Sequence, residues 1–230
     1  MGANGAAMPR RAGEIKEDEI GDDMGLSADQ LRTALDALAA AEPRFAAALA
    51  RVGYPEPRIR ARGYATLLRT IVGQQVSVKA ASSIWAKLEA VVGDLDDPVT
   101  IACATDEQLR EAGLSRQKAS YARSLADEVT SGRLDLANLP VDDEEAIAAL
   151  SRIKGIGRWS AEIYLLFAEG RGDIWPAGDL AVQIEIGRIL GHPERPSEKL
   201  TRECAEGWRP HRGAAAILAW HHYGTPMPIN

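Results

Sequence analysis

The sequence predicts an all-α protein, and three observations support that prediction. Apolar residues recur at helical spacing through most of the chain after residue 24. The strict alternation of apolar and polar residues that marks half-buried strands is nearly absent. The connections between helical stretches are short, as they are between packed helices. Residues 1–24 are rich in glycine, alanine, arginine and acids without any periodicity, so we expect them to form a flexible tail.

The elements follow in chain order. Ser27 is a good helix cap, and Leu31, Leu35 and Leu38 after it lie on one helical face. The stretch "RGYATLLRTIVGQQVSVKAASSIWAKLEAVVG" predicts two helices that meet near residues 73–75. Thr105, with Gln108 three residues later, fits a capping box. Further helices are expected at 105–112, 116–131, 143–152, 158–169, 179–190, 197–206 and 212–222.

Composition limits the class of protein. The chain is 46% hydrophobic, but no apolar run approaches the roughly 20 residues of a membrane span. The amino end lacks the apolar stretch of a secretory signal, and two cysteines are too few for a disulfide framework. The four histidines and two cysteines also lack zinc or iron–sulfur spacing. These features predict a cytoplasmic protein that needs no cofactor and does not bind membranes.

The net charge of −6 argues mildly against nucleic acid as a partner, since phosphate binders tend to be basic. However, the first 30 residues hold seven acids and three bases, which leaves only −2 for the other 200 residues. The charge of residues 31–230 is therefore compatible with a local basic face.

The stretch "LSRIKGIGRWSAEIYLLF" places Gly155 and Gly157 between two helical segments. Glycine permits positive φ, and a helix that starts directly after the turn leaves its first amides without intrahelical partners. Those amides and the helix dipole form an anion site that can hold a phosphate without reading sequence. The alternative is an ordinary helix-to-helix turn. A weaker echo at 109–122, "LREAGLSRQKASYA", has the same two interpretations.

Beyond this turn, five blocks resemble the HhH-GPD DNA glycosylases, in the branch related to DNA-3-methyladenine glycosylase II. The blocks stand in family order and span roughly residues 45–223; they are 67–85, 112–126, the hairpin, 175–190 and 208–223. The resemblance implies two helical subdomains with the active cleft between them. We expect subdomain A at about 25–94 plus 176–230, and subdomain B at about 95–175 with the hairpin at 153–158. Helical sequence begins near residue 26 and the cysteine cluster of the endonuclease III branch is missing, so the compact branch without an amino-terminal β domain is expected.

The resemblance assigns the chemistry to Asp179, which matches the family's catalytic aspartate. A fixed carboxylate stabilises the oxocarbenium-like transition state and can orient or deprotonate the attacking water. From the local sequence alone, Asp179 is also a good N-cap for a helix over 180–190, and both roles can coexist. Asp173 is the nearest rival. Bifunctional members carry a nucleophilic lysine where this chain has Trp159, so no strand cleavage is expected.

The resemblance also implies a base pocket. Trp159 and Trp220 match pocket aromatics that stack on the flipped, electron-poor base. Ile163 falls at a usual pocket position, which leaves the role of its neighbour Tyr164 in doubt. Gln75, beside Gln74, matches the wedge that fills the gap in the duplex.

Phosphate contacts are expected from Ser115, Lys118, Gly155, Gly157, Arg158 and Ser160. The carbonyls of Ser151, Ile153 and Ile156 are candidate ligands for a structural Na+ or K+ at the hairpin. Trp208, Arg209 and Arg212 are expected to brace the last helix, and His221 and His222 to serve as surface or packing residues.

The function that the resemblance implies is monofunctional hydrolysis of the N-glycosidic bond of alkylated purines, such as 3-methyladenine and 7-methylguanine, in double-stranded DNA. The enzyme would be a monomer of broad specificity that starts base-excision repair, nucleoid-associated in a bacterium. One alternative is a non-catalytic helix–hairpin–helix DNA-binding module, which has no need of a carboxylate near DNA. Another is a glycosylase for oxidised or mismatched bases.

Overall fold

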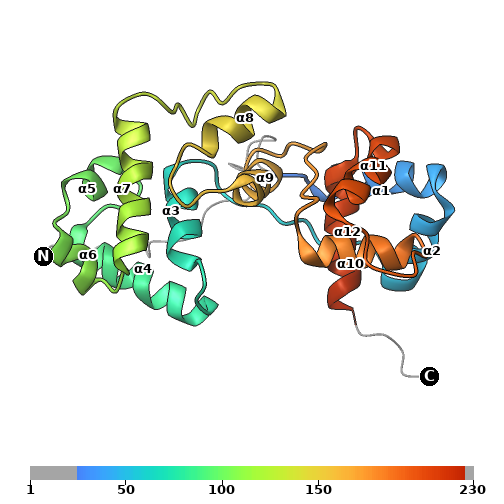
Figure 1. Cartoon of the computed structure of the whole chain (residues 1–230), viewed down its shortest axis with the longest axis horizontal. Coiled ribbons are helices and arrows are strands. Elements are labelled where there is room, and N and C mark those ends of the chain that lie inside the picture. The colour runs from blue at the N-terminus through green and yellow to red at the C-terminus, as the bar shows by residue number, and fades with distance from the viewer. Residues whose placement is uncertain (1–24, 226–230) are drawn as a thin grey trace, which may run out of the picture.

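The computed structural model describes residues 25–225, and in this range it contains helices and no strands, which confirms the all-α prediction (Figure 1). The helices are α1 (Ala28–Ala41), α2 (Pro43–Val52), α3 (Tyr64–Gly73), α4 (Val78–Val92), α5 (Pro98–Cys103), α6 (Asp106–Glu111), α7 (Arg116–Thr130), α8 (Asp143–Leu150), α9 (Arg158–Phe167), α10 (Leu180–Ile189), α11 (Glu198–Ala205) and α12 (Arg212–Gly224), with a short 3₁₀ turn η2 (Glu206–Trp208) before α12. The predicted tail at 1–24 lies outside the described residues.

The three helix caps that the sequence predicts, Ser27, Thr105 and Asp179, are all present. The Thr105 hydroxyl accepts from the Gln108 amide at 3.2 Å, and the Gln108 side chain accepts from the Thr105 amide at 2.8 Å. Ser27 and Gln30 form a second capping box at α1. Two short helices that begin at Pro43 and Pro98, α2 and α5, were not predicted from the sequence. Proline suits the first helical position because its missing N–H is not needed there.

The helices form two lobes, seen at the right and left of Figure 1. Lobe 1 contains α1, α2, α10, α11, η2 and α12, and lobe 2 contains α3 to α7 with the α8–α9 hairpin attached. Helix α9 lies between the lobes, where Leu166 lies against Gly213 of α12. Within the described chain, no helix is both long and apolar enough to cross a bilayer.

One predicted boundary is wrong. Subdomain A was expected to hold residues 25–94, but α3 packs on α7 and α4 packs on α6, so the stretch 64–92 belongs to lobe 2. The chain leaves lobe 1 earlier, through the extended linker at 53–63. The apolar faces of α3 and α4 identify them as packed helices, but an apolar face does not specify its partner.

Candidate active site

Asp179 ends the segment that leads into α10, and it is the N-cap of that helix. Its Oδ1 accepts a hydrogen bond from the Val182 amide at 2.9 Å, so the expected capping role is confirmed. The preceding segment is anchored in lobe 1, because the Trp175 indole donates to the Thr201 carbonyl at 3.2 Å. The Gln183 side chain donates to the Ala177 carbonyl at 2.7 Å. These contacts fix the backbone position from which the carboxylate projects.

Two indole groups, one on α9 and one on α12, hold the same carboxylate. Trp159 Nε1, on α9, donates to Asp179 Oδ2 at 2.9 Å, and Trp220 Nε1, on α12, donates to Oδ1 at 3.1 Å. With the Val182 amide, three N–H donors orient both oxygens. A negative charge held in this way is suited to stabilise positive charge that develops on a neighbouring group. The sequence predicted all three residues but not the hydrogen bonds that join them.

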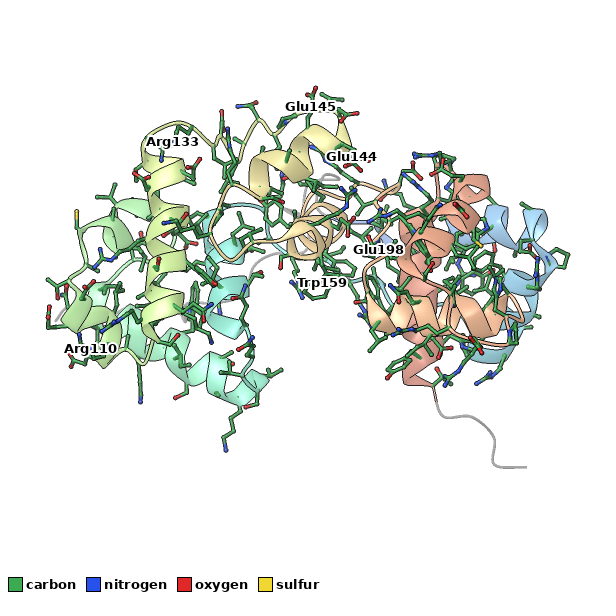
Figure 2. All side chains as sticks on the ribbon, in the orientation of Figure 1. Arg110, Arg133, Glu144, Glu145, Trp159 and Glu198 are labelled. Atoms are coloured by element: carbon green, nitrogen blue, oxygen red, sulfur yellow. The ribbon has the colours of Figure 1, made fainter. Side chains whose placement is uncertain are left out.

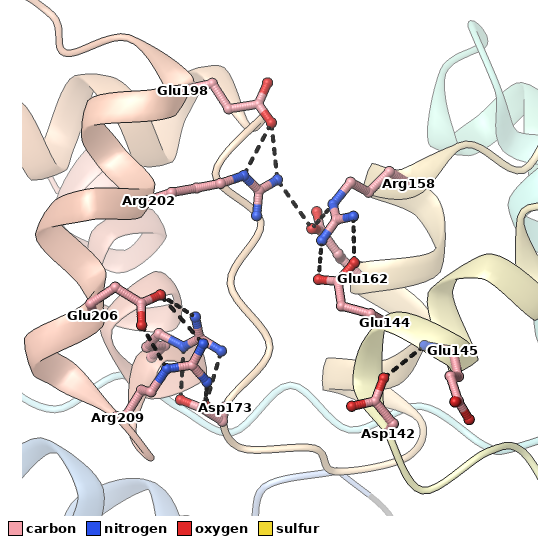
Figure 3. Close-up of polar contacts among 11 residues, drawn as sticks. Asp142, Glu144, Glu145, Arg158, Glu162, Asp173, Glu198, Arg202, Glu206 and Arg209 are labelled. Atoms are coloured by element: carbon pink, nitrogen blue, oxygen red, sulfur yellow. Dashed lines mark hydrogen bonds and ion pairs between the residues drawn. The ribbon is translucent and has the colours of Figure 1, made fainter.

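The rival carboxylate, Asp173, is engaged elsewhere. Its oxygens accept from Arg209 at 2.6 Å and from Arg212 at 2.9 Å, and Figure 3 shows Asp173 beside Arg209 and Glu206. Arg212 is the first residue of α12, so these ion pairs fasten the start of the last helix. Trp208 packs edge-on against Trp175 with ring centroids 5.4 Å apart. The predicted bracing role is confirmed for Arg212, whereas Arg209 and Trp208 hold the segment before α12 against Asp173 and Trp175.

A hollow of about 810 Å³ opens beside Trp159, between α3, α9 and the linker. It is lined by Arg60, Ala61, Thr66, Arg69, Thr70, Gly73, Gln74, Gln75, Trp159, Ser160 and Ile163. Trp159 is 47% exposed, and Figure 2 shows it between the lobes, on the side of α9 away from Glu144. An aromatic face is therefore available to a flat ligand in the cleft.

Ile163 lines this hollow, but Tyr164 does not. Tyr164 is 2% exposed, and its hydroxyl accepts from the Gly63 amide at 2.9 Å. Neighbouring residues on a helix point about 100° apart, so only one of the two can face the hollow. The expectation that Tyr164 contributes to the pocket is wrong; it fixes the linker instead. Burial raises the pKa of its hydroxyl.

The two glutamines of the α3–α4 loop have different roles. Gln74 Nε2 donates to the Gly155 carbonyl at 2.8 Å, so Gln74 ties this loop to the hairpin and is not a free wedge. Gln75 is exposed and adopts a positive φ of 55°, which is unusual for a residue other than glycine. Such strained positions cluster at ligand sites. The wedge role of Gln75 is compatible with this position and remains a prediction.

The hairpin glycines also differ. Gly155 has φ 84°, and an added Cβ would lie 2.1 Å from a ring atom of Tyr121. Gly157 is the N-cap of α9 and has no side chain to cap it, so the first amides of that helix lack a side-chain acceptor. An added Cβ at Gly157 would meet no atom within 4 Å. The geometry matches a backbone anion site that a strand could approach closely.

Two of the six expected phosphate contacts are occupied by protein groups. Arg158 forms paired hydrogen bonds to Glu144, at 2.8 and 2.5 Å, and one to Glu162 at 2.9 Å, and the Glu144 partnership raises its pKa (Figure 3). Lys118 Nζ donates to the Val72 carbonyl at 2.7 Å, and burial lowers its pKa. Both assignments are corrected, because a position beside a turn does not determine where a long side chain points.

The other phosphate and packing candidates are as follows. Ser115 is exposed and caps α7 by accepting from the Lys118 amide at 3.3 Å. Ser160 lines the hollow. His221 and His222 are packing residues: His221 contacts the Val52 carbonyl at 2.9 Å, and His222 is buried at 2.5 Å from Glu185.

Comparisons with known proteins agree with this geometry. Residues 68–210 match the family model described as "HhH-GPD superfamily base excision DNA repair protein". The chain is 31% identical over 161 residues to DNA-3-methyladenine glycosylase 1 of Schizosaccharomyces pombe, which covers 68% of this chain and 71% of that one. Three curated relatives align over 71%, 58% and 76% of their own lengths.

Solved structures are also similar. A DNA-3-methyladenine glycosidase from Bacillus halodurans superposes with a TM-score of 0.75 at 31% identity, covering 84% of this chain and 89% of that one. The 3-methyladenine DNA glycosylase of S. pombe in complex with abasic DNA superposes with a TM-score of 0.66 at 28% identity, covering 83% and 95%.

Proposed function

The chain belongs to the HhH-GPD superfamily of base excision DNA repair proteins, and from that premise we propose that it is a DNA glycosylase that hydrolyses the N-glycosidic bond of alkylated purines in duplex DNA. The relatives with similar sequence and structure are named as 3-methyladenine glycosylases. The observation that carries the proposal is the Asp179 carboxylate, which three N–H donors from both lobes orient beside an exposed tryptophan and a hollow.

In the reaction, the damaged nucleotide leaves the base stack and its base enters the cleft beside Trp159. The bond between the sugar and the base breaks, and positive charge develops on the sugar. Asp179 stabilises that charge and accepts the proton of the attacking water. The uncapped amides at the start of α9 hold a backbone phosphate, while Gln75 enters the gap in the duplex.

The proposal includes a monofunctional mechanism. The position that would carry a nucleophilic lysine holds Trp159, whose indole has no basic nitrogen and already donates to Asp179. Water is therefore the nucleophile, and the product is an abasic site in an intact strand. A non-catalytic DNA clamp is a weaker explanation, because a partly exposed carboxylate such as Asp179 would repel DNA without a compensating use.

We also propose that the enzyme works as a monomer, in the cytoplasm and on the nucleoid if the source is a bacterium, because its substrate would be chromosomal DNA. A hairpin Na+ or K+ belongs to the same proposal. The Ile153 carbonyl accepts from the Ile156 amide at 3.0 Å, which leaves its second lone pair for a cation.

The direct test is incubation of the full chain with methylated duplex DNA, followed by chromatography of the released bases and gel analysis of the strands. We expect free 3-methyladenine or 7-methylguanine, and strands that break only after alkali treatment. Binding to DNA without any base release would contradict the glycosylase function and support the DNA-clamp function. Strand breaks before alkali treatment would contradict the monofunctional mechanism.

A further inference from the structure

Two side chains near the carboxyl end of α12 bind the same neighbouring helix. Trp220 Nε1 donates to Asp179 Oδ1 at 3.1 Å, at the N-cap of α10, and His222 Nδ1 lies 2.5 Å from Glu185 Oε2, farther along α10. The two attachment points are about 9 Å apart along α10, at about 1.5 Å per residue. Helices α10 and α12 pack on each other in lobe 1 (Figure 1). One contact therefore holds the candidate catalytic carboxylate, and the other has no part in the proposed chemistry.

The second contact, the Glu185–His222 pair, is buried. Glu185 is 0% exposed and His222 is 6% exposed. Both oxygens of the carboxylate are paired, because Arg188 Nη1 lies 2.5 Å from Oε1 and His222 lies against Oε2. Burying a carboxylate costs free energy even when it is paired, so replacing such a pair by apolar residues of similar size is often neutral or stabilising. Stability alone therefore does not explain why this pair lies in the core of lobe 1.

The hydrogen bonds of His222 have a defined direction. Arg51 Nη1, from α2, lies 3.2 Å from His222 Nε2. A guanidinium group can only donate, so Nε2 is the acceptor. The proton of the neutral imidazole is then on Nδ1, which donates it to Glu185 Oε2. Three helices, α2, α10 and α12, thus meet at one ring whose orientation is set from both sides.

Apolar packing specifies the register between α10 and α12 weakly. Besides Ile217 and Leu218, the buried apolar part of α12 consists of small residues: Gly213, Ala214, Ala215, Ala216 and Ala219. Uniform surfaces of this kind pack closely but do not select one relative position of two helices. A hydrogen bond does select one, because a displaced partner leaves a buried donor or acceptor unpaired. Fixing register is the best-attested use of a buried polar pair.

We propose that Glu185 and His222 are positioning residues: their buried hydrogen bond fixes the register of α12 on α10 and thereby holds the Trp220 N–H against the Asp179 carboxylate. This inference rests on the proposed glycosylase function, in which Asp179 is the catalytic group. When the pair is lost, Trp220 no longer orients Oδ1, and the carboxylate loses one of its three donors. A misplacement of about 1 Å reduces the rate of a reaction by up to about 10²-fold. The pair therefore acts on the chemical step and not on DNA binding.

Three variants separate register from stability. Glu185→Gln keeps the shape of the side chain and an oxygen that accepts from His222. Glu185→Leu removes the acceptor and leaves the imidazole N–H unpaired, which costs stability. The double variant Glu185→Leu, His222→Phe replaces both partners by apolar groups, so it should fold with a thermal stability close to that of wild type. Only the double variant lacks the hydrogen bond while the fold stays stable.

The first measurement does not depend on activity. In the full chain labelled with ¹⁵N, the Trp220 indole N–H signal is identified by its loss in Trp220→Phe. We expect this signal to shift and to exchange faster with water in the double variant, and to keep its wild-type position in Glu185→Gln. The signal of Trp175, which donates to the Thr201 carbonyl, should not move. A Trp220 signal that is unchanged in the double variant overturns the inference, whether or not the protein is a glycosylase.

The second measurement is the single-turnover release of 7-methylguanine from duplex DNA, together with the affinity for that DNA. The double variant should release the base about tenfold or more slowly at unchanged affinity, and Glu185→Gln should stay close to wild type. Leu31→Ala is the control for stability, since it removes packing from the core of lobe 1 without removing a polar contact. It should melt at a lower temperature but release the base at the wild-type rate while folded. A wild-type rate in the double variant contradicts the positioning role.

A double-mutant cycle shows whether the pair acts through Trp220. In the Trp220→Phe background the N–H donor is already gone, so removing the pair as well should slow base release by less than about twofold. If removing the pair slows release by the same factor in both backgrounds, the two sites are independent and the inference is overturned. Absence of base release by wild type would refute the proposed function, whereas the position of the Trp220 signal would still decide whether the pair sets the register.

Discussion

At the scale of single residues, Asp179 combines two roles that a sequence pattern presents as alternatives. Its Oδ1 caps α10 and accepts from Trp220, while Oδ2 accepts from Trp159. The cap is what allows the second role: it fixes the side-chain torsion, so the carboxylate is presented to the cleft in one orientation. Capping and catalysis are therefore coupled at this position, and a substitution must preserve the first to test the second.

Asp179→Asn makes that separation, since asparagine caps helices as well as aspartate does. We expect retained binding to alkylated duplex DNA and slightly lower thermal stability, because the asparagine Nδ2 would face the Trp159 N–H donor. Base release should fall by about 10²-fold or more, because the fixed negative charge is gone. Asp142→Asn is the matched control: Asp142 caps α8 through the Glu145 amide at 2.9 Å, away from the cleft. Base release near the wild-type rate in Asp179→Asn would remove the carboxylate from the chemistry.

The site residues that the sequence motifs predicted correctly are those whose positions are fixed by the backbone. Asp179 follows from a helix start, and Trp159 and Trp220 from fixed positions on helices. The residues they misplaced are those next to a motif whose long side chains could turn either way: Arg158 turned to Glu144, and Gln74 to the hairpin carbonyl.

At the scale of elements, the hairpin uses its two glycines for different physical reasons. Gly155 is required by conformation and by packing, because its φ is 84° and Tyr121 leaves no room for a Cβ. Gly157 adopts φ −87° and ψ 176°, which any residue can adopt, and faces open space. Gly157 is thus not needed for folding. Its absent side chain instead leaves the α9 amides open.

Gly155→Ala should therefore lower the free energy of unfolding by about 2 kcal/mol or more, from left-handed strain and the displaced Tyr121 ring. Gly157→Ala should change it little, and is the matched control in urea denaturation followed by circular dichroism. Equal stability of the two variants would mean that the turn relaxes without cost.

Gly157→Asp should have opposite effects on folding and binding. An aspartate at an N-cap stabilises a helix, but here its charge would stand where a phosphate is proposed to sit. We expect equal or higher thermal stability, weaker binding to duplexes of any sequence, and a salt dependence shallower by about one phosphate contact. Gly157→Asn is the matched control, because asparagine caps the same amides without adding a charge. If wild type and Gly157→Asp bind DNA with equal affinity, the DNA backbone does not contact the amides at the start of α9.

At the scale of the whole molecule, the sequence predicted most of the helices but assigned α3 and α4 to the wrong lobe. Periodicity and caps are local properties, so they located the starts of α6 to α12 within a residue or two. The boundary between the lobes depends on which apolar faces meet, and that information is spread over residues far apart in the chain. The same limit applies to the contacts that join the lobes.

One set of those contacts is a chain of ion pairs from α11 to α8 (Figure 3). Arg202 contacts Glu198 at 2.9 Å on its own helix and Glu162 at 3.6 Å on α9. Glu162 in turn pairs with Arg158, which binds Glu144. Glu162 is 2% exposed, and burial raises its pKa although two arginines act in the opposite direction. Glu162, the central carboxylate of this bridge of ion pairs between α11 and α8, is therefore ionised at an electrostatic cost.

That cost predicts an inverted pH dependence for Glu162. Because its folded pKa lies above the ordinary value of 4.5, the folded protein binds the proton more tightly than the unfolded chain does. The contribution of Glu162 to stability is most favourable below 4.5 and declines as the pH rises through the folded pKa. Glutamine keeps the shape without titrating, and Arg158 and Arg202 retain Glu144 and Glu198 as partners. Glu162→Gln should therefore gain stability relative to wild type between pH 4.5 and 7.

Urea denaturation of both proteins across this pH range measures the difference, and Glu203→Gln serves as the control because Glu203 is a solvent-exposed acid on α11. A difference that shrinks as the pH rises would mean that attraction to Arg158 and Arg202 outweighs burial, so that the ionised bridge stabilises the contact between the lobes. A growing difference would mean that the bridge is kept for the geometry it imposes, since it holds α9, with Trp159, at a fixed distance from the lobe that carries Asp179.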